Sequence, residues 1–174
     1  AATIDSSSGG STTLTTANNT TVVFNFPSNF YTEDVRLQAN SYASDFFSSS
    51  KPPVSGKSFI GKTYDFNLYT SSAGTQIATT SVAVAITISY TSSDVSGIDE
   101  STLAPYRWRS SDSSWQLIPG ATLDTANNKV TFSTTSFSSF ALFGSPPQQQ
   151  QGGGGGGGGG GGYIAPAETA AVFS

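Results

Sequence analysis

Carboxylates are the groups that this sequence offers for catalysis. The chain has no His and no Cys, which excludes Ser-His-Asp and Cys-His triads within one chain and zinc sites built from those ligands. Two carboxylates about 5 to 9.5 Å apart could still hydrolyse a glycosidic bond. The candidates are Glu33, Asp34, Asp45, Asp65, Asp94, Asp99, Glu100, Asp112, Asp124 and Glu168. Most of them lie in Ser-, Asn- or Gly-rich turns, where Asp typically caps the local backbone. We therefore predict that the protein is not an enzyme and has no catalytic residues.

One loop gathers oxygen ligands that a hard cation could use. Asp94, Asp99 and Glu100 share it with Ser96 and Gly97, and Ca²⁺ prefers clustered oxygens. The spacing does not match an EF-hand loop. We interpret the loop as a turn and expect no metal and no cofactor, with a structural calcium site as the alternative.

Three aromatic residues could form a platform for sugars. Alternation places Tyr106 and Trp108 on one face of a hairpin strand, opposite Trp115 and Leu117. Aromatic residues dominate protein cores and pair across strands. The pattern therefore favours a buried cross-strand cluster over an exposed sugar platform.

The sequence also contains two overlapping acceptor motifs for N-glycosylation. Asn18 and Asn19 each begin an Asn-x-Thr triplet. If the producing cell makes glycans, we expect them at this loop.

These residues must be positioned by strands, because the dominant hydrophobic period is two. From Val82 to Tyr90 large apolar residues alternate with Ala, Thr and Ser, as in a strand with one face on a core. Further strands are expected at Thr21–Phe26, Val35–Ala39, Tyr64–Leu68, Gln76–Thr80, Tyr106–Trp108, Trp115–Leu117, Val130–Phe132 and Phe140–Leu142. Turns are expected at Ser71–Gly74, Ser110–Ser114 and Asn127–Asn128, and a loop at Ser48–Gly56. No stretch shows a sustained helical period. The sequence predicts an all-β fold, an Ig-like antiparallel β-sandwich of about seven to ten strands with extended termini.

Composition narrows the class of protein. Charged residues make up 10% of the chain, against about 25% in typical soluble domains, and Ser and Thr supply the polarity instead. The net charge is -4 and the seven basic residues are scattered, so we expect no nucleic-acid partner. No run of apolar residues is long enough for a transmembrane segment. The first residues, Ala1-Ala2-Thr3, fit a chain after signal-peptide removal, so we expect a secreted, extracellular or cell-surface protein.

The C-terminal region differs from the rest of the chain. We divide the sequence into a β-sandwich domain with an N-terminal extension (1–145), a Pro/Gln/Gly linker (146–162) and a tail (163–174). The linker ends in eleven consecutive glycines, Gly152 to Gly162. Each Gly loses more backbone freedom on ordering than any other residue, so we expect a neighbouring copy of the chain to hold this run in place. A plain spacer to a further domain is the alternative.

The tail is the segment best suited to pair with another copy. Its large apolar residues are Tyr163, Ile164, Val172 and Phe173. Pro166 would interrupt pairing in the first half, which leaves Ala167–Ser174 as the donated strand.

The N-terminus is the rival donor. Ala1–Asp5 and Thr12–Thr16 flank Ser6–Gly10, which we interpret as a flexible hinge. Its only large apolar residues are Ile4 and Leu14, so it has less apolar surface to bury.

A series of short motifs runs from Lys62 to Gly144. They are Ala85-Ile86-Thr87-Ile88-Ser89-Tyr90, Asp94 with Gly97-Ile98-Asp99-Glu100, Leu103 with Tyr106, Trp115-Gln116-Leu117, Asp124-Thr125-Ala126-Asn127-Asn128 and Phe137-Ser138-Ser139-Phe140-Ala141-Leu142. With these motifs the stretch resembles an Ig-like β-sandwich module of bacterial cell-surface and secreted proteins. The resemblance implies a non-catalytic extracellular building block. Such modules often carry a His just before the Phe-Ser pair, where this chain has Ser136.

The organisation of the chain also resembles subunits of donor-strand pili, in which a terminal segment completes the sheet of the next subunit. We therefore expect a structural subunit of an extracellular filament or surface layer, a homopolymer whose copies are joined by strand donation. The alternative is an adhesive or carbohydrate-binding module on a glycine spacer, with surface glycans as its partners.

Overall fold

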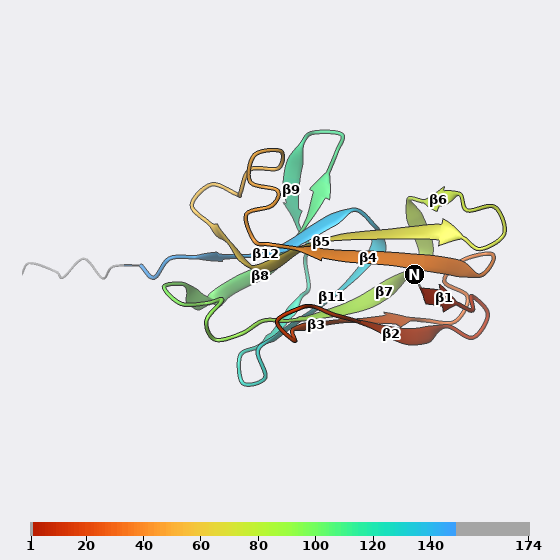
Figure 1. Cartoon of the computed structure of the whole chain (residues 1–174), viewed down its shortest axis with the longest axis horizontal. Coiled ribbons are helices and arrows are strands. Elements are labelled where there is room, and N and C mark those ends of the chain that lie inside the picture. The colour runs from red at the N-terminus through yellow and green to blue at the C-terminus, as the bar shows by residue number, and fades with distance from the viewer. Residues whose placement is uncertain (1, 149–174) are drawn as a thin grey trace, which may run out of the picture.

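The computed structural model describes residues 2–148, and these residues form two antiparallel sheets packed face to face (Figure 1). The first sheet has the order β1 (Ala2–Ile4), β4 (Val35–Tyr42), β5 (Ser58–Thr70), β12 (Ser139–Ser145), β8 (Asp99–Arg109) and β9 (Ser114–Leu117), with β6 (Gln76–Ile77) paired to β5. The second has the order β10 (Thr122–Asp124), β11 (Lys129–Ser136), β7 (Thr79–Ser89), β3 (Thr21–Phe26) and β2 (Gly10–Thr15). The predicted all-β, antiparallel sandwich is confirmed. No helix among residues 2–148 is long or apolar enough to cross a membrane.

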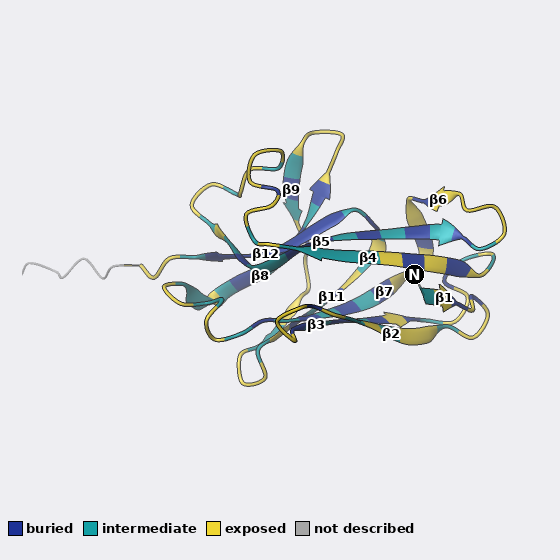
Figure 2. Ribbon diagram, in the orientation of Figure 1, coloured by how far each residue is buried: buried dark blue, intermediate teal, exposed yellow. Residues whose placement is uncertain are grey.

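The main core lies between the sheets (Figure 2). Alternate residues of β7 (Val84, Ile86 and Ile88) are buried, as the period of two predicts. Phe24 of β3 meets Phe66 of β5 across the sandwich, edge to face, with ring centroids 4.8 Å apart. Such contacts between opposite sheets hold the two layers together.

The outer end of β7 departs from this pattern. Val82 continues the alternation in sequence but is 43% exposed. The ladder with β3 ends at Ala85, and the pairing with β11 is irregular between Thr134 and Ser136. Val82 therefore lies beyond the regular part of the β7 ladders.

The segment predicted as one strand, Gln76–Thr80, is divided between the sheets. Ile77 pairs with Leu68 in the first sheet, whereas Thr79 pairs with Ser136 in the second. The chain changes sheets at Ala78. Alternation alone cannot indicate such a crossing, because the side chains on both sides of it still point alternately toward a core.

The N-terminal residues belong to the sandwich, which differs from the expected extension with a hinge at Ser6–Gly10. Residues 5–9 form a hydrogen-bonded turn that carries the chain from β1 in one sheet to β2 in the other. The amide of Gly9 donates to the carbonyl of Asp5 at 2.9 Å, and the amide of Ser7 donates to the Asp5 carboxylate at 2.8 Å. Hydrogen bonds from Ser7, its hydroxyl first, lower the pKa of Asp5. Local bonds thus fix the segment that composition alone predicted to be flexible.

A second apolar cluster lies against the first sheet, apart from the main core. Its buried members are Tyr106, Trp108, Trp115, Ala141 and Phe143. The β8–β9 hairpin places Trp108 directly opposite Trp115, so the predicted buried cross-strand cluster is confirmed. Leu117, expected beside Tyr106 in that cluster, is instead 54% exposed, because it ends the edge strand β9.

Candidate functional site

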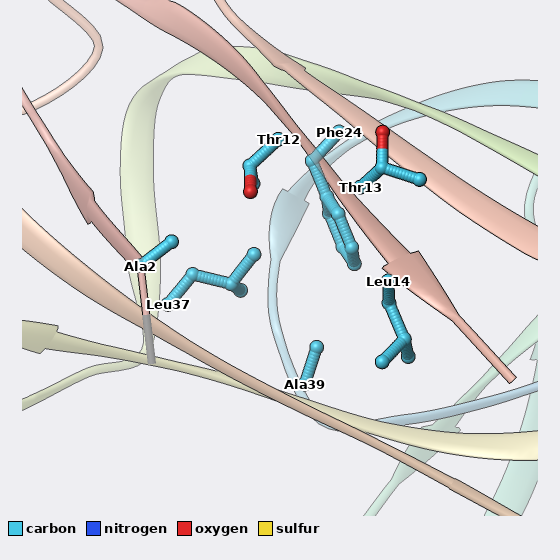
Figure 3. A pocket seen from close by; sticks show the side chains of 7 residues that line it. All are labelled: Ala2, Thr12, Thr13, Leu14, Phe24, Leu37 and Ala39. Atoms are coloured by element: carbon cyan, nitrogen blue, oxygen red, sulfur yellow. The ribbon is translucent and has the colours of Figure 1, made fainter.

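β2, which ends one sheet, and β1 with β4, which end the other, lie on the same side of the sandwich and leave a groove between them. The groove has a volume of about 240 Å³. It is lined by Ala2, Thr12, Thr13, Leu14, Phe24, Leu37 and Ala39. In Figure 3, Leu14 and Phe24 extend from one sheet toward Leu37 and Ala39 on the other. The groove therefore lies at the rim of the inter-sheet core, next to Phe24 and Leu37.

The groove lining carries no charged side chain, and five of its seven residues are apolar. Phe24 and Leu37 are buried members of the main core, whereas Ala2, Leu14 and Ala39 pack against it and are only partly buried. The hydroxyls of Thr12 and Thr13 are the polar side-chain groups of its lining. Such a surface can bury apolar side chains and offers no group for acid–base chemistry.

The backbone beside the groove has unused pairing capacity. β1 pairs with β4 only over Val35–Leu37. Along Gln38–Tyr42, β4 has no strand partner on that side among the described residues. The outer edge of β2 is likewise unpaired within residues 2–148. These edges can accept a further strand through main-chain hydrogen bonds.

Edge strands are usually protected against such pairing. The opposite side of this sandwich has such protection. There the edge strands β9 and β10 have only four and three residues, and shortness is one common protection. Lys, Pro and inward-pointing charges are further protections. Neither β2 nor Gln38–Tyr42 contains a charged residue or Pro. Within residues 2–148 the groove side thus lacks the protection by shortness, charge or Pro.

A second cavity, of about 440 Å³, lies beside the outer aromatic cluster. Its lining includes Lys51, Asp65, Asn67, Trp108 and Ser139. Its acidic and amide groups are already bound within the chain: the Ser139 hydroxyl donates to Asp65, and Gln76 donates to Asn67 at 3.0 Å. Trp108 is only 8% exposed. The cavity therefore lacks the open aromatic face on which a sugar ring stacks.

The loop considered for calcium uses its carboxylates separately. Asp94 accepts hydrogen bonds from the amide and hydroxyl of Thr91, both at 2.7 Å. Asp99 accepts from the hydroxyl of Ser101 at 2.6 Å, and Glu100 accepts from the hydroxyl of Tyr90 at 2.6 Å. Among residues 2–148 no group of three acidic side chains comes together. The capping role predicted for these residues fits this arrangement.

Other acidic residues also serve turns. Asp112 pairs with Arg109 across the β8–β9 turn, and this hydrogen bond lowers the pKa of Asp112 to about 2. Asp124 accepts from the amide nitrogen of the Asn127 side chain at 2.7 Å, which lowers the pKa of Asp124. Both carboxylates therefore remain ionised at neutral pH and bound to local partners.

The predicted glycosylation residues lie together in the turn from β2 to β3. Asn18 and Asn19 are both exposed, and Asn19 has a left-handed backbone with φ of 62°. The side-chain oxygen of Asn18 accepts from Thr20 at 3.0 Å. Thr20 is buried. The turn thus presents two asparagines to solvent while its threonine hydroxyl is bound inside.

The predicted assembly residues lie outside the described part of the chain. They are Gly152, Gly162, Tyr163, Ile164, Val172 and Phe173. The acceptor side, in contrast, is described, and it was not among the sequence predictions. Its signal was present in the alternation of Thr12 and Leu14 and in the uncharged stretch Gln38–Tyr42, but which strands form sheet edges follows from the topology.

No protein-family model matches the chain, and a search of the curated proteins finds no match.

Proposed function

We propose that the protein is a structural subunit of an extracellular filament or surface layer, in which each copy donates a strand to the next. The observation that supports this most is the unpaired edge of β4 beside an uncharged groove at the rim of the core. A surface of this kind is avoided in chains that stay apart, because it invites pairing with other chains. A subunit that polymerises needs such a surface.

The donor in this proposal is the C-terminal tail. Ala167–Ser174 carries Val172 and Phe173 and contains a single charge, Glu168. Linker residues 148–162 could span about 50 Å when extended, at 3.3–3.6 Å per residue. That reach is enough to cross to a neighbouring copy. Burial of Phe173 would favour the complex through the hydrophobic effect.

The low charge suits close packing of copies. Only 10% of the residues are charged, so adjacent subunits meet through hydroxyl-rich faces with little repulsion. The same composition supports an extracellular location, where a layer or filament would be exposed.

Deletion of the tail tests the proposal. The chain without residues 163–174 should fold with an unchanged far-ultraviolet circular dichroism spectrum and sediment as a monomer, whereas the full chain should form higher species. Glu168→Gln, in the same segment, is the control and should assemble normally. Assembly that survives the deletion would exclude the tail as donor.

An adhesive or carbohydrate-binding module is the second candidate. The cavity of about 440 Å³ beside Trp108 is where a sugar would bind, but Trp108 offers no open face for stacking there. Because Trp108 lines that cavity, sugar binding should change its fluorescence. Titration with a panel of oligosaccharides tests this function, and a flat response would count against it.

A further inference from the structure

We infer that the acceptor site for the donated strand is the uncovered edge of β4, where the tail of a second copy continues the line of β1 and places Phe173 in the groove. This inference rests on the proposed assembly by strand donation. Beyond that proposal, it specifies which surface accepts the strand, which segment binds there and which side chain enters the groove.

The position follows from β1. This strand already pairs with the outer edge of β4, with Ala2 opposite Leu37, Thr3 opposite Arg36 and Ile4 opposite Val35. Beyond Leu37 the same edge continues through Gln38–Tyr42 with no partner among the described residues. A strand added there extends an existing ladder. It also covers the groove, because Ala39 belongs both to that edge and to the groove lining.

The side chains of the tail match the two faces of such a strand. Successive residues of a strand point to opposite faces, so Ala167, Thr169, Ala171 and Phe173 share one face. This face has small residues followed by one large ring, and it carries no charge. Glu168 falls on the other face, toward solvent. The uncharged groove accepts the first face and would exclude the second, since burial of an unpaired carboxylate is costly.

The tail of a second copy is the occupant, because the other candidate donor, the N-terminal segment, already packs within its own sandwich. Ile4 is a buried member of the main core, and Leu14 packs against that core from β2. Donation of the N-terminus would remove both from their own sandwich. The tail removes nothing from the described fold.

Disulfide trapping tests the inference, and the chain suits it because it contains no Cys. If Phe173 lies beside Ala39, then Val172 lies on the outer face beside Asn40 in an antiparallel pair or beside Gln38 in a parallel pair. Full-length chains with Val172→Cys are mixed with full-length chains that carry either Asn40→Cys or Gln38→Cys. Leu117→Cys, on the edge strand at the opposite end of the same sheet, replaces them in the control.

We expect one of the two groove variants to give at least about tenfold more disulfide-linked heterodimer than Leu117→Cys, because pairing raises the local concentration of the two thiols. Assembly of the chains with cross-linking at the control level would overturn the inference and leave the filament proposal standing. Failure of the unsubstituted chain to assemble would overturn the filament proposal itself. A single chain carrying both cysteines that cross-links only within itself would show that the tail occupies its own groove, which contradicts a second copy as occupant.

Discussion

Trp108 and Trp115 lie directly opposite each other on β8 and β9, with ring centroids 5.4 Å apart and ring planes at 72°. This edge-to-face pair contacts Phe143 through Trp115, at 5.3 Å between centroids. The indole N–H of Trp115 donates to the carbonyl of Lys51 at 3.3 Å. The pair therefore holds the loop around Lys51 against the first sheet. It belongs to a cluster that is separate from the core between the sheets.

Loss of this anchor should destabilise the fold. We expect Trp115→Ala to lower the free energy of unfolding by about 3–5 kcal/mol, the usual range for removal of a buried Trp side chain. Leu117→Ala, two residues along the same strand but 54% exposed, should change it by less than about 0.5 kcal/mol. Chemical denaturation of both variants measures the contrast. If Trp115→Ala lowers the free energy of unfolding as little as Leu117→Ala does, the outer cluster contributes no stability.

The groove predicts an unusual response to a larger side chain. Ala39→Leu should fill part of the 240 Å³ space, so we expect the monomer to keep its stability or gain up to about 1 kcal/mol. The same variant should weaken assembly, because it occupies the proposed acceptor site. Ala141→Leu is the matched control: Ala141 is 1% exposed in a packed cluster, and the added volume should cost about 1–3 kcal/mol.

If Ala39→Leu destabilises the chain as much as Ala141→Leu does, the groove is not open space. Denaturation and sedimentation of the two variants, side by side, separate the effect on folding from the effect on assembly.

Substitution by Ala should lower the stability of the fold by different amounts at two glycines with left-handed backbones. Gly97 has φ of 76° and nothing within 4 Å of an added Cβ, so Gly97→Ala should cost about 1–2 kcal/mol from backbone strain alone. Gly9 has φ of 72°, but an added Cβ would lie 2.3 Å from the carbonyl oxygen of Phe26. Gly9→Ala must also displace the backbone between β2 and β3, so its cost should clearly exceed that of Gly97→Ala. Similar unfolding midpoints for the two variants would contradict the close packing of this turn.

Buried tyrosines predict a loss of stability in alkali. Burial raises the pKa of Tyr64, with repulsion from Asp94 as a smaller cause. Burial also raises the pKa of Tyr90, together with its hydrogen bond to Glu100. The unfolded chain releases these protons near the ordinary value of 10.0, whereas the folded chain retains them to higher pH. Their contribution is therefore complete below pH 10 and is lost as the pH rises through the folded pKa.

The measurement is the free energy of unfolding between about pH 9 and pH 11, with Tyr90→Phe as the comparison. The wild-type chain should lose stability over this interval, and Tyr90→Phe should lose less. A stability that does not change with pH here would mean that the tyrosines titrate normally in the fold.

The sequence predicted the sandwich because alternation is a local property. Residues such as Ile86 and Ile88 report which face of a strand is buried, whichever strands lie beside it. The turns were predictable for a similar reason: Asn128 adopts φ of 53°, a conformation that Asn tolerates better than most residues.

The candidate site could not be predicted in the same way. An edge is defined by the strand that is missing, and strand order depends on long-range pairing that alternation does not encode. The change of sheet at Ala78 and the return of β1 to β4 both decide where the groove lies, and both are tertiary events. The tail was identified by composition, but its acceptor required the topology.

Chain termination tests the central claim most directly. A copy that lacks residues 163–174 keeps the groove and has no strand to donate, so it should accept a tail and stop growth at that end. We predict that adding this truncated chain to the full chain shortens the assemblies seen by electron microscopy, in proportion to the amount added. Assemblies of unchanged length at every ratio, or a full chain that sediments as a monomer at every concentration, would contradict strand donation between copies.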